Sequence, residues 1–353
     1  MSRIDIHHLT KRWGDVPAVD EVSFTVPEGS LTVLLGPSGC GKSTILRLIA
    51  GLEATTSGAI AIGGKDVTHM DPAERGVSMV FQSYALFPHL TVRENILFGL
   101  KVRGIAKDDR RARLEKAARM VGLADLLNRK PSQLSGGQRQ RVALARSIVS
   151  RRPVCLMDEP LSNLDAKLRA EMRDEIRSLQ QKLRLTMVYV THDQVEAMTM
   201  ADQVVLLQQG HVEQIGQPHT LYENPRTIFA AQFLGSPPMN LLKIDVIGDR
   251  GALAAAGGGN LPSGCPSQGF IGVRPEDVLV GPQGLPVRVA AVDYLGSETV
   301  VRMAYDGQPL FARINGRRDY APGEALHISW PEKAVHCFGP DGISIEGARK
   351  APS

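Results

Sequence analysis

The segment Gly36-Pro37-Ser38-Gly39-Cys40-Gly41-Lys42-Ser43-Thr44 decides the fold of this chain. It fits the pattern G-x-x-x-x-G-K-[S/T], in which a glycine-rich loop lets backbone N–H groups approach phosphate groups at the start of a helix. The apolar run Leu31–Leu35 before it predicts a buried parallel strand, and Ser43–Ala50 after it predict a helix that ends at Gly51. Because strand, loop and helix follow in the order that the motif needs, we expect a phosphate-binding site rather than a turn without a ligand.

Individual residues of this loop have distinct expected roles. The whole loop is expected to surround the phosphates, Lys42 to reach the terminal ones, and the Ser43 hydroxyl to ligate Mg²⁺. Cys40 lies inside the loop, and two interpretations of it stay open. The nearby lysine and helix N-terminus favour a reactive thiol with a lowered pKa, whereas a small buried side chain that only fills space is equally compatible.

Residues 1–235 alternate strand-like and helix-like segments, which predicts an α/β domain with a mostly parallel sheet. Within it, residues 108–149 have the pattern of helix after helix, so we expect a helical subdomain at about residues 86–150, between two strands of the sheet. Four further runs predict two buried strands and a hairpin around Gly210: Val154–Met157, Met187–Val190, Val204–Leu207 and His211–Ile215.

Residues 236–353 are richer in Gly and Pro, which marks a second domain. Short alternating runs predict a small all-β barrel or sandwich there: Val287–Val289, Thr299–Met303 and Leu326–Trp330. Residues 248–269 include three consecutive glycines and predict a turn region. We therefore expect the boundary between two domains at residue 235.

Composition excludes several classes of protein. No apolar run reaches the roughly 18 residues of a membrane-spanning helix, and no apolar stretch follows Arg3 as in a secretory signal. The four cysteines are scattered without a C-x-x-C pair, which argues against a zinc site and predicts a reduced, cytoplasmic chain. The net charge is only +4, and residues 236–353 carry 11 basic and 12 acidic residues, so no surface for wrapping nucleic acid is expected.

Two acids, Asp158 and Glu159, directly follow the predicted strand Val154–Met157. A carboxylate at a strand end beside the phosphate loop is placed to bind Mg²⁺, which is the role expected for Asp158. Glu159 is then placed to polarise the attacking water as a general base. An acid pair after a strand is also common in caps and turns, and it is the phosphate loop that favours the catalytic interpretation.

The pentapeptide Leu134-Ser135-Gly136-Gly137-Gln138 precedes a predicted helix. A serine and two glycines at a helix start predict a second anion site. A plain helix cap would account for Ser135, but not for Gly136, Gly137 and Gln138 together. Combined with the phosphate loop and the acid pair, this pentapeptide resembles the ATP-binding cassette (ABC) ATPases, and the resemblance covers residues 1–235.

The resemblance implies roles for further residues and implies ATP and Mg²⁺ as cofactors. Gln82 matches the glutamine that contacts Mg²⁺ and the attacking water, and His192 matches the histidine that touches the γ-phosphate. Trp13 matches the aromatic position that stacks on adenine. Asp165 matches the acid of a loop that crosses a dimer interface. The expected catalytic residues are thus Glu159, His192, Gln82 and Lys42.

The resemblance also implies partners. In this family the loop of Ser135, Gly136 and Gly137 completes the site of the opposite subunit, so a homodimer is expected to enclose ATP. Two integral-membrane permease subunits are expected to bind the segment after Gln82, where Leu86 and Phe87 predict an exposed apolar surface. An extracytoplasmic solute-binding protein completes such a complex. The chain is then a peripheral protein on the cytoplasmic face of a bacterial inner membrane.

The residues after position 235 indicate which subfamily of the ABC ATPases the chain resembles. Three segments are similar to the maltose, trehalose and glycerol-phosphate importer ATPases: Phe233–Asn240, Gly272–Asp277 and Tyr294–Glu298. The resemblance implies an oligonucleotide/oligosaccharide-fold-like C-terminal domain that holds the dimer and can receive a regulatory protein. It implies that ATP hydrolysis drives import of a sugar or sugar-derived solute.

Alternatives to this function stay open. Polyamine and ferric-iron importer ATPases carry a related C-terminal domain. A soluble ABC ATPase is disfavoured because the chain has neither a second cassette nor a coiled-coil insertion, and an exporter half rarely carries this barrel. A nucleic-acid-binding barrel is disfavoured because residues 236–353 have few aromatics and a net charge of −1.

Overall fold

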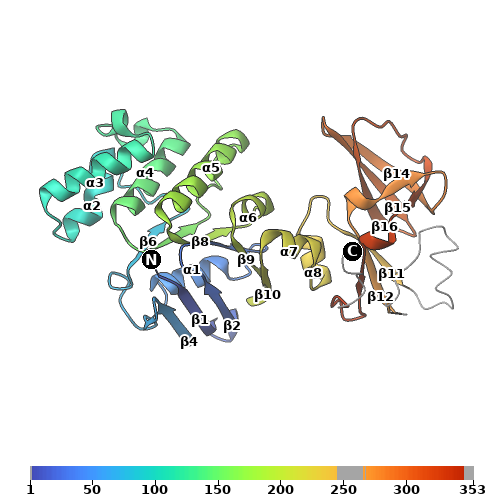
Figure 1. Cartoon of the computed structure of the whole chain (residues 1–353), viewed down its shortest axis with the longest axis horizontal. Helices are drawn as coiled ribbons and strands as arrows, with labels where there is room; N and C mark the ends of the chain where they lie inside the picture. Colours follow the sequence, from blue (N-terminus) through green and yellow to red (C-terminus); the bar gives the residue numbers. More distant parts are fainter. Residues whose placement is uncertain (1, 245–264, 267, 346–353) are drawn as a thin grey trace. The chain divides into compact units, whose positions relative to one another are not determined.

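The computed structural model describes residues 2–244, 265–266 and 268–345, and the chain divides into two compact units, Met1–Pro218 and His219–Ser353 (Figure 1). This division comes earlier than the expected boundary at residue 235, because the short helices α7 (Pro218–Glu223) and α8 (Ile228–Phe233) pack with the second unit. The Arg274 guanidinium explains this packing, since it donates hydrogen bonds to the carbonyl oxygens of residues in or beside both helices: Tyr222, Ala231 and Leu234.

The main sheet of the first unit has six strands in the order β10-β9-β3-β8-β7-β6. Strand β10 (His211–Gly216) pairs antiparallel with its neighbour β9. The other five strands are parallel to one another: β3 (Leu31–Leu35), β6 (Val77–Val80), β7 (Val154–Asp158), β8 (Thr186–Thr191) and β9 (Gln203–Gln208). Every residue of β3, β7 and β8 is buried, as expected for central parallel strands covered on both faces. The α/β prediction and the hairpin around Gly210 are confirmed.

A second, antiparallel sheet in this unit has the order β2-β1-β4-β5. Its strands are β1 (Ile4–Trp13), β2 (Val16–Val26), β4 (Ser57–Ile62) and β5 (Lys65–Asp66). Helix α1 (Lys42–Ala50) directly follows the phosphate loop, and its side chains Ile45, Leu46 and Ile49 share one core with residues of both sheets. Because α1 packs on both sheets, the loop at its N-terminus is held from both sides.

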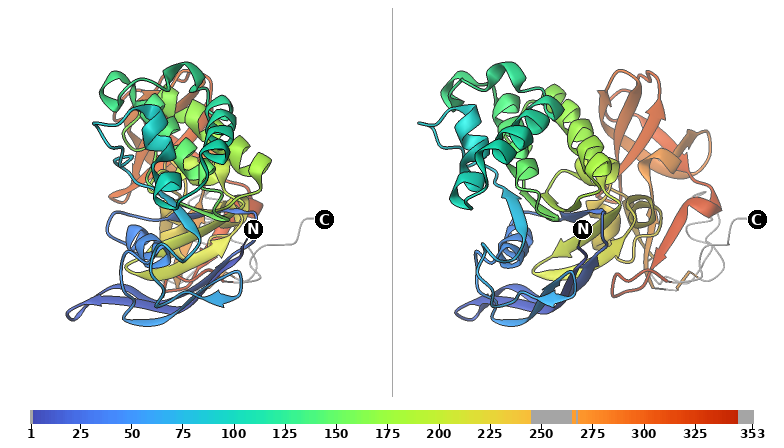
Figure 2. Two further views of the ribbon diagram at one scale, coloured as in Figure 1. Left: turned by 90° about the vertical axis from the view of Figure 1, so that its left-hand side faces the viewer. Right: turned by 60° about the vertical axis from the view of Figure 1, so that its left-hand side comes forward.

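Three helices form a separate group between β6 and β7, seen on one side of the unit in Figure 2: α2 (Val92–Val102), α3 (Lys107–Met120) and α4 (Gly136–Val149). Two 3₁₀ turns, Ala124–Leu126 and Pro131–Gln133, lie between α3 and α4. Helix α5 (Ala166–Leu183) follows β7, and α6 (Gln194–Met200) follows β8. Within the described residues, no helix is long and apolar enough to cross a membrane.

The described part of the second unit is built from two antiparallel sheets in the orders β11-β12-β18 and β13-β17-β14-β15-β16. The strands are β11 (Asn240–Ile244), β12 (Gly269–Val273), β13 (Leu279–Gly281), β14 (Leu285–Tyr294), β15 (Glu298–Tyr305), β16 (Gln308–Asn315), β17 (Ala325–Ser329) and β18 (Val335–Phe338). Buried Val287, Val301 and Ile328 join one apolar core, as their alternation predicts. The predicted turn region 248–269 lies mostly outside the described residues.

The cysteines differ from the expectation of four reduced thiols. Cys265 and Cys337 form a disulfide with their Cα atoms 5.5 Å apart, and both side chains are buried in the core of the second unit. Cys40 and Cys155 are free and buried. The expectation was wrong because cysteine spacing alone does not say which side chains meet in the fold.

We expect two thiols to react with maleimide when the chain is denatured without reductant, and four after reduction. The disulfide closes a loop across a sequence separation of 72 residues, so it is expected to stabilise the second unit by about 4 kcal/mol. Mass spectrometry of the alkylated chain counts the thiols, and the double variant Cys265→Ala, Cys337→Ala should give two under both conditions. Four reactive thiols before reduction would contradict the disulfide.

Candidate functional site

The phosphate loop connects β3 to α1 and folds around its own lysine. The Lys42 side chain is buried, and its Nζ donates hydrogen bonds to the carbonyl oxygens of Gly36 at 2.8 Å and Pro37 at 2.7 Å. A Cβ at Gly36 would lie 2.3 Å from the carbonyl oxygen of Leu207, so only glycine fits there. No side chain caps the N-terminus of α1. The first N–H groups of this helix, which have no intrahelical partner, are therefore available to an anion.

Ser43 and Asp158 form the oxygen-rich side of the site. Ser43 Oγ donates a hydrogen bond to Asp158 Oδ1 at 2.6 Å, because β7 ends at Asp158 on the same sheet as β3. Hydroxyl and carboxylate oxygens are ligands that Mg²⁺ prefers. No group of three or more His, Cys, Asp or Glu able to hold a metal occurs within the described ranges.

Glu159 and His192 lie in direct contact. His192 Nδ1 is 3.3 Å from Glu159 Oε2, and His192 follows the end of β8. Glu159 has the left-handed φ of 42°, and its N–H donates to the carbonyl oxygen of Val190. A non-glycine residue in this backbone region is uncommon and concentrates at functional sites. The structure thus brings together the two side chains that are expected to act on the attacking water and the γ-phosphate.

Gln82 is connected to the loop that follows Glu159. Gln82 Nε2 donates to Ser162 Oγ at 3.3 Å, and Asn163 Nδ2 donates to the carbonyl oxygen of Gln82 at 3.1 Å. Ser162 Oγ in turn donates to the carbonyl oxygen of Glu159 at 3.0 Å. The loops after the neighbouring strands β6 and β7 are therefore joined, and Gln82, Glu159 and His192 belong to one contact group.

The remaining predicted residues do not join this group through any hydrogen bond or ion pair between described residues. Trp13 is 53% exposed at the end of β1, with Lys11 Nζ 5.5 Å from its ring centroid. Asp165 Oδ1 accepts from the N–H of Leu168 and caps α5. Ser135 caps α4. All three are exposed at the surface of the first unit.

Helix capping explains more of the pentapeptide than the sequence suggests. Ser135 Oγ accepts from the N–H of Gln138, and Gln138 Oε1 accepts from the N–H of Ser135, which makes a capping box. A Cβ on Gly137 would lie 2.9 Å from Leu168 Cδ1 of α5, so a larger residue there would require the Leu168 side chain to shift. The capping box thus accounts for Gln138, which was expected to lie outside the cap, but not for Gly136 and Gly137, and the second anion site stays a prediction.

The Cys40 side chain packs in the interior of the first unit, which is not the environment of an activated thiol. Its side chain is 3% exposed, and its Sγ lies 3.7 Å from Lys42 Nζ. Burial raises the pKa of Cys40, and this effect outweighs the opposing charge and hydrogen bonds of Lys42. Of the two interpretations left open, the structure therefore favours the space-filling one.

Several residues that support the site were missed from the sequence. Asn95 of α2 is fully buried, and it binds the N–H of Phe87 and the carbonyl oxygens of Phe87, Leu90 and Thr91. Arg169 pairs with Asp193, next to His192, at 3.3 Å and donates to the carbonyl oxygen of Leu164. The signal available for Asn95 is a polar residue at a helix position that apolar spacing assigns to the core.

The surface after Gln82 is apolar, but its exposed members differ from those expected. Phe87 is half-buried because its ring packs on Phe98, with centroids 4.5 Å apart. Phe98 is 40% exposed and Val102 is 72% exposed, both on α2. The expected exposed pair Leu86 and Phe87 is thus part of a wider surface to which α2 contributes.

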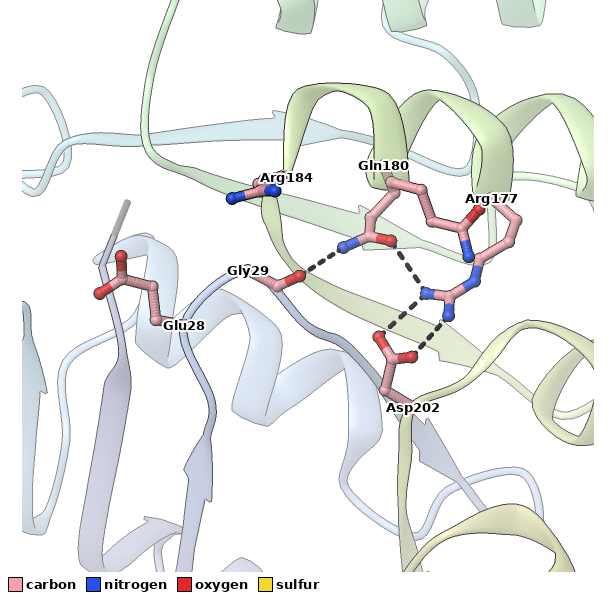
Figure 3. Close-up of a pocket in the computed structure, with 7 residues that line it drawn as sticks. Glu28, Gly29, Arg177, Gln180, Arg184 and Asp202 are labelled. Atoms are coloured by element: carbon pink, nitrogen blue, oxygen red, sulfur yellow. Dashed lines mark hydrogen bonds and ion pairs between the residues drawn. The ribbon is translucent and has the colours of Figure 1, made fainter.

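A polar cavity of about 420 Å³ lies beside Glu28 and Gly29, just before β3, whereas the phosphate loop follows the other end of that strand. Figure 3 shows the residues that line it. Three of the side chains that line it are linked to one another and to the backbone: Gln180 Nε2 donates to the carbonyl oxygen of Gly29 at 2.8 Å, and Arg177 donates to Asp202 and to Gln180 Oε1. Burial alone would raise the pKa of the Asp202 carboxyl, but hydrogen bonds from Arg177 and from the Leu31 N–H hold this pKa below its usual value. These contacts anchor the C-terminal end of α5 to the sheet.

A glycine-rich loop between a parallel strand and a helix, with an acid pair at the end of another parallel strand of the same sheet, defines a P-loop nucleoside-triphosphatase domain. Residues 19–162 match the family described as ABC transporter, and residues 271–338 match the TOBE domain. The chain is 48% identical to the sn-glycerol-3-phosphate import ATP-binding protein UgpC of Brucella abortus, over 98% of this chain and 99% of the relative. It is 44% identical to the protein of that name from Yersinia pseudotuberculosis, over 98% and 100%.

Solved structures show the same fold. A dimeric bacterial ABC transporter cassette is 32% identical with a TM-score of 0.55, over 61% of this chain and 98% of that chain. The same cassette in a post-hydrolysis state with ADP and Pi is 31% identical, also with a TM-score of 0.55 and the same coverage. The chain therefore belongs to the ATP-binding subunits of ABC importers, and it is an ATPase.

We expect Glu159→Gln to bind ATP normally but to hydrolyse it about 10²–10⁴-fold more slowly, because the amide cannot accept a proton from water. Steady-state phosphate release and a nucleotide-binding titration separate the two effects. Glu115→Gln, which neutralises an exposed carboxylate on α3, is the matched control and should hydrolyse ATP at the unmodified rate. Near-normal hydrolysis by Glu159→Gln would remove Glu159 from the role of general base.

Proposed function

We propose that this importer ATPase drives uptake of a sugar-derived solute of the glycerol-phosphate class. The observation that carries the proposal is similarity over nearly the whole chain, including the second unit, to sn-glycerol-3-phosphate import ATP-binding proteins from Brucella, Agrobacterium and Yersinia at 44–48% identity. This similarity favours a glycerol phosphate over a polyamine or ferric iron, the alternatives left open by the sequence.

In the proposed site, the phosphate loop binds the nucleotide phosphates, and Lys42 Nζ exchanges the carbonyl oxygens of Gly36 and Pro37 for phosphate oxygens. Mg²⁺, when bound, neutralises charge on these phosphates, with Ser43, Asp158 and Gln82 as its protein contacts. Support comes from the Ser43–Asp158 hydrogen bond, which already places two oxygen ligands together. Adenine stacks on the exposed ring of Trp13, a contact that typically contributes about 1–3 kcal/mol.

Glu159 accepts the proton of the attacking water in this proposal. His192, with Nδ1 3.3 Å from the Glu159 carboxylate, orients that carboxylate and contacts the γ-phosphate. Gln82 follows β6 and lies on the other side of the attacking water in this proposal. Its hydrogen bond to Ser162, which in turn contacts Glu159, supports a position of the Gln82 side chain beside that water. Each of these groups comes from the carboxyl end of a parallel strand, where α/β sheets bind their ligands.

We also propose that two copies of the chain enclose ATP between them. Ser135, Gly136, Gly137, Gln138 and Asp165 of one copy would then complete the site of the other. The exposed positions of Ser135 and Asp165 support this arrangement, as does the dimeric state of the related bacterial cassette. The second unit is expected to strengthen the dimer and to offer a surface for a regulatory protein.

The proposed membrane partners are two permease subunits, reached through Phe87, Phe98 and Val102, with an extracytoplasmic solute-binding protein on the far side. An exposed apolar surface that lies next to Gln82 supports this placement, because a partner there would contact the loop that carries Gln82. The chain would accordingly lie on the cytoplasmic face of the inner membrane.

The solute class is tested with the complex that co-purifies with the tagged chain from its own membranes, reconstituted with its solute-binding protein. We expect glycerol phosphates to stimulate ATP hydrolysis, and polyamines and ferric iron to leave the rate at its basal level. Stimulation by a polyamine or ferric iron instead would establish one of the alternatives. A chain that recovers no membrane partner would favour a soluble ATPase.

Phe87→Asp is expected to leave ATP binding by the isolated chain intact but to weaken assembly with the permeases and abolish stimulation by solute. Coupling is reciprocal, so a partner bound at this surface must alter turnover, and a charge placed in the apolar contact removes that partner. Leu279→Asp, at a 54% exposed apolar position in the second unit, is the matched control. Normal assembly and stimulation in Phe87→Asp would place the permease contact elsewhere.

A further inference from the structure

The loop after Gln82 holds an unfavourable backbone conformation. Tyr84 has a φ of 64° and Ala85 a φ of 44°, so two consecutive residues with a Cβ lie in the left-handed region. Such a conformation is disfavoured for L-residues and is rarest for bulky ones such as tyrosine. The Tyr84 side chain is also buried, and its hydroxyl has no hydrogen-bond partner among the described residues. A contact from outside the loop must therefore hold this conformation.

That contact comes from Arg146 on α4. Arg146 Nη1 donates to the carbonyl oxygen of Ala85 at 2.7 Å, and Nη2 donates to that of Tyr84 at 2.8 Å. The planar guanidinium matches two consecutive carbonyl oxygens in a way that a lysine ammonium cannot. Among the described residues Arg146 forms no ion pair, and burial lowers the pKa of its guanidinium. Its charge is thus directed at the two carbonyl groups of the strained turn.

We propose that Arg146 is a positioning residue: it holds Tyr84 and Ala85 in the left-handed region and thereby fixes Gln82 relative to the helix that begins with Ser135–Gln138. Helix α4 carries both ends of this connection, because the pentapeptide forms its N-terminus and Arg146 lies in its last turn. A displacement of α4 would therefore be transmitted to carbonyl groups two and three residues from Gln82. The inference rests on the proposed role of Gln82 at the nucleotide.

The other contacts of the loop do not replace Arg146. Asn95 binds the backbone at Phe87, Leu90 and Thr91, which lies beyond the strained pair. The N–H of Tyr84 donates to the carbonyl oxygen of Phe81 within the same turn, and this bond does not connect the loop to another element. Asn95 and Arg146 both belong to the helical group, so residues 84–91 are tied to that group, whereas Gln82 itself contacts Ser162 and Asn163 in the loop after β7.

The test compares full-length Arg146→Met with Ala85→Gly, with the double variant, and with Arg141→Met. Glycine adopts the left-handed region about as readily as the right-handed one, so Ala85→Gly removes the backbone penalty at one of the two residues that Arg146 holds. Arg141 lies on the same helix but pairs with Glu175 at 3.0 Å and does not contact the loop, so it controls for loss of a charge on α4. Hydrogen exchange of the nucleotide-free chain over residues 81–91 measures the loop without depending on turnover.

We expect Arg146→Met to speed exchange over residues 81–91 and to lower kcat about tenfold, with ATP affinity unchanged, since left-handed backbone is disfavoured by roughly that factor. Adding Ala85→Gly should restore both protection and kcat to within about threefold of the unmodified chain, and Arg141→Met should change neither. Unchanged exchange in Arg146→Met, or faster exchange that Ala85→Gly does not slow, would overturn the proposal. If Arg146→Met fails to fold, Arg146→Lys in the same cycle gives the same test.

Restored protection with unrestored kcat would have a different meaning. It would show that Arg146 holds the loop and that Gln82 does not act in hydrolysis, so the proposed role of Gln82 would fail while the structural assignment stood.

Discussion

The buried ammonium group of Lys42 is the constraint on which the rest of the cassette depends. Its hydrogen-bond partners among the described residues are the carbonyl oxygens of Gly36 and Pro37 and the thiol of Cys40, and none of them is a carboxylate. Removing a cation from water without a counter-charge costs several kcal/mol. The loop keeps Lys42 there because β3 and α1 fix its two ends within one apolar core. The same cost favours binding of an anion, which supplies the missing counter-charge.

The remaining groups of the site are arranged around this charge by the parallel sheet. Strand β8 pairs with β3, and β7 is the next strand beyond β8. They end at Thr191, just before His192, and at Asp158. Because parallel strands end at a common edge, residues more than a hundred positions apart in the sequence become contacts, as Ser43 and Asp158 do. The strain at Glu159 follows from the same arrangement, since its N–H bonds to β8 while its side chain reaches His192.

The buried strands before the phosphate loop, the acid pair and the histidine could be predicted, because each motif directly follows an apolar run and the end of that run fixes the place of the next residue. The order of these strands in the sheet was not predicted. The contacts of Arg146 and Asn95 could not be predicted. Their partners are backbone groups, and every residue has the same backbone groups, so the sequence does not show which of them a side chain will contact. Arg146 and Ala85 are 61 positions apart. The pairing of Cys265 with Cys337 and the attachment of α7 and α8 to the second unit depend equally on contacts distant in sequence.

Helix α5 has one more consequence for how the site moves. It has 18 residues, so it is about 27 Å long, and its C-terminal end is anchored at the far edge of the sheet by Arg177 and Gln180. Its N-terminal end begins at Asp165, in the loop whose Ser162 and Asn163 contact Gln82. The helix can therefore tilt about its anchored C-terminal end, which lies away from the phosphate loop. A tilt of about 5° about that end shifts the Asp165 end by roughly 2 Å over this length, which is enough to break or make the hydrogen bonds to Gln82.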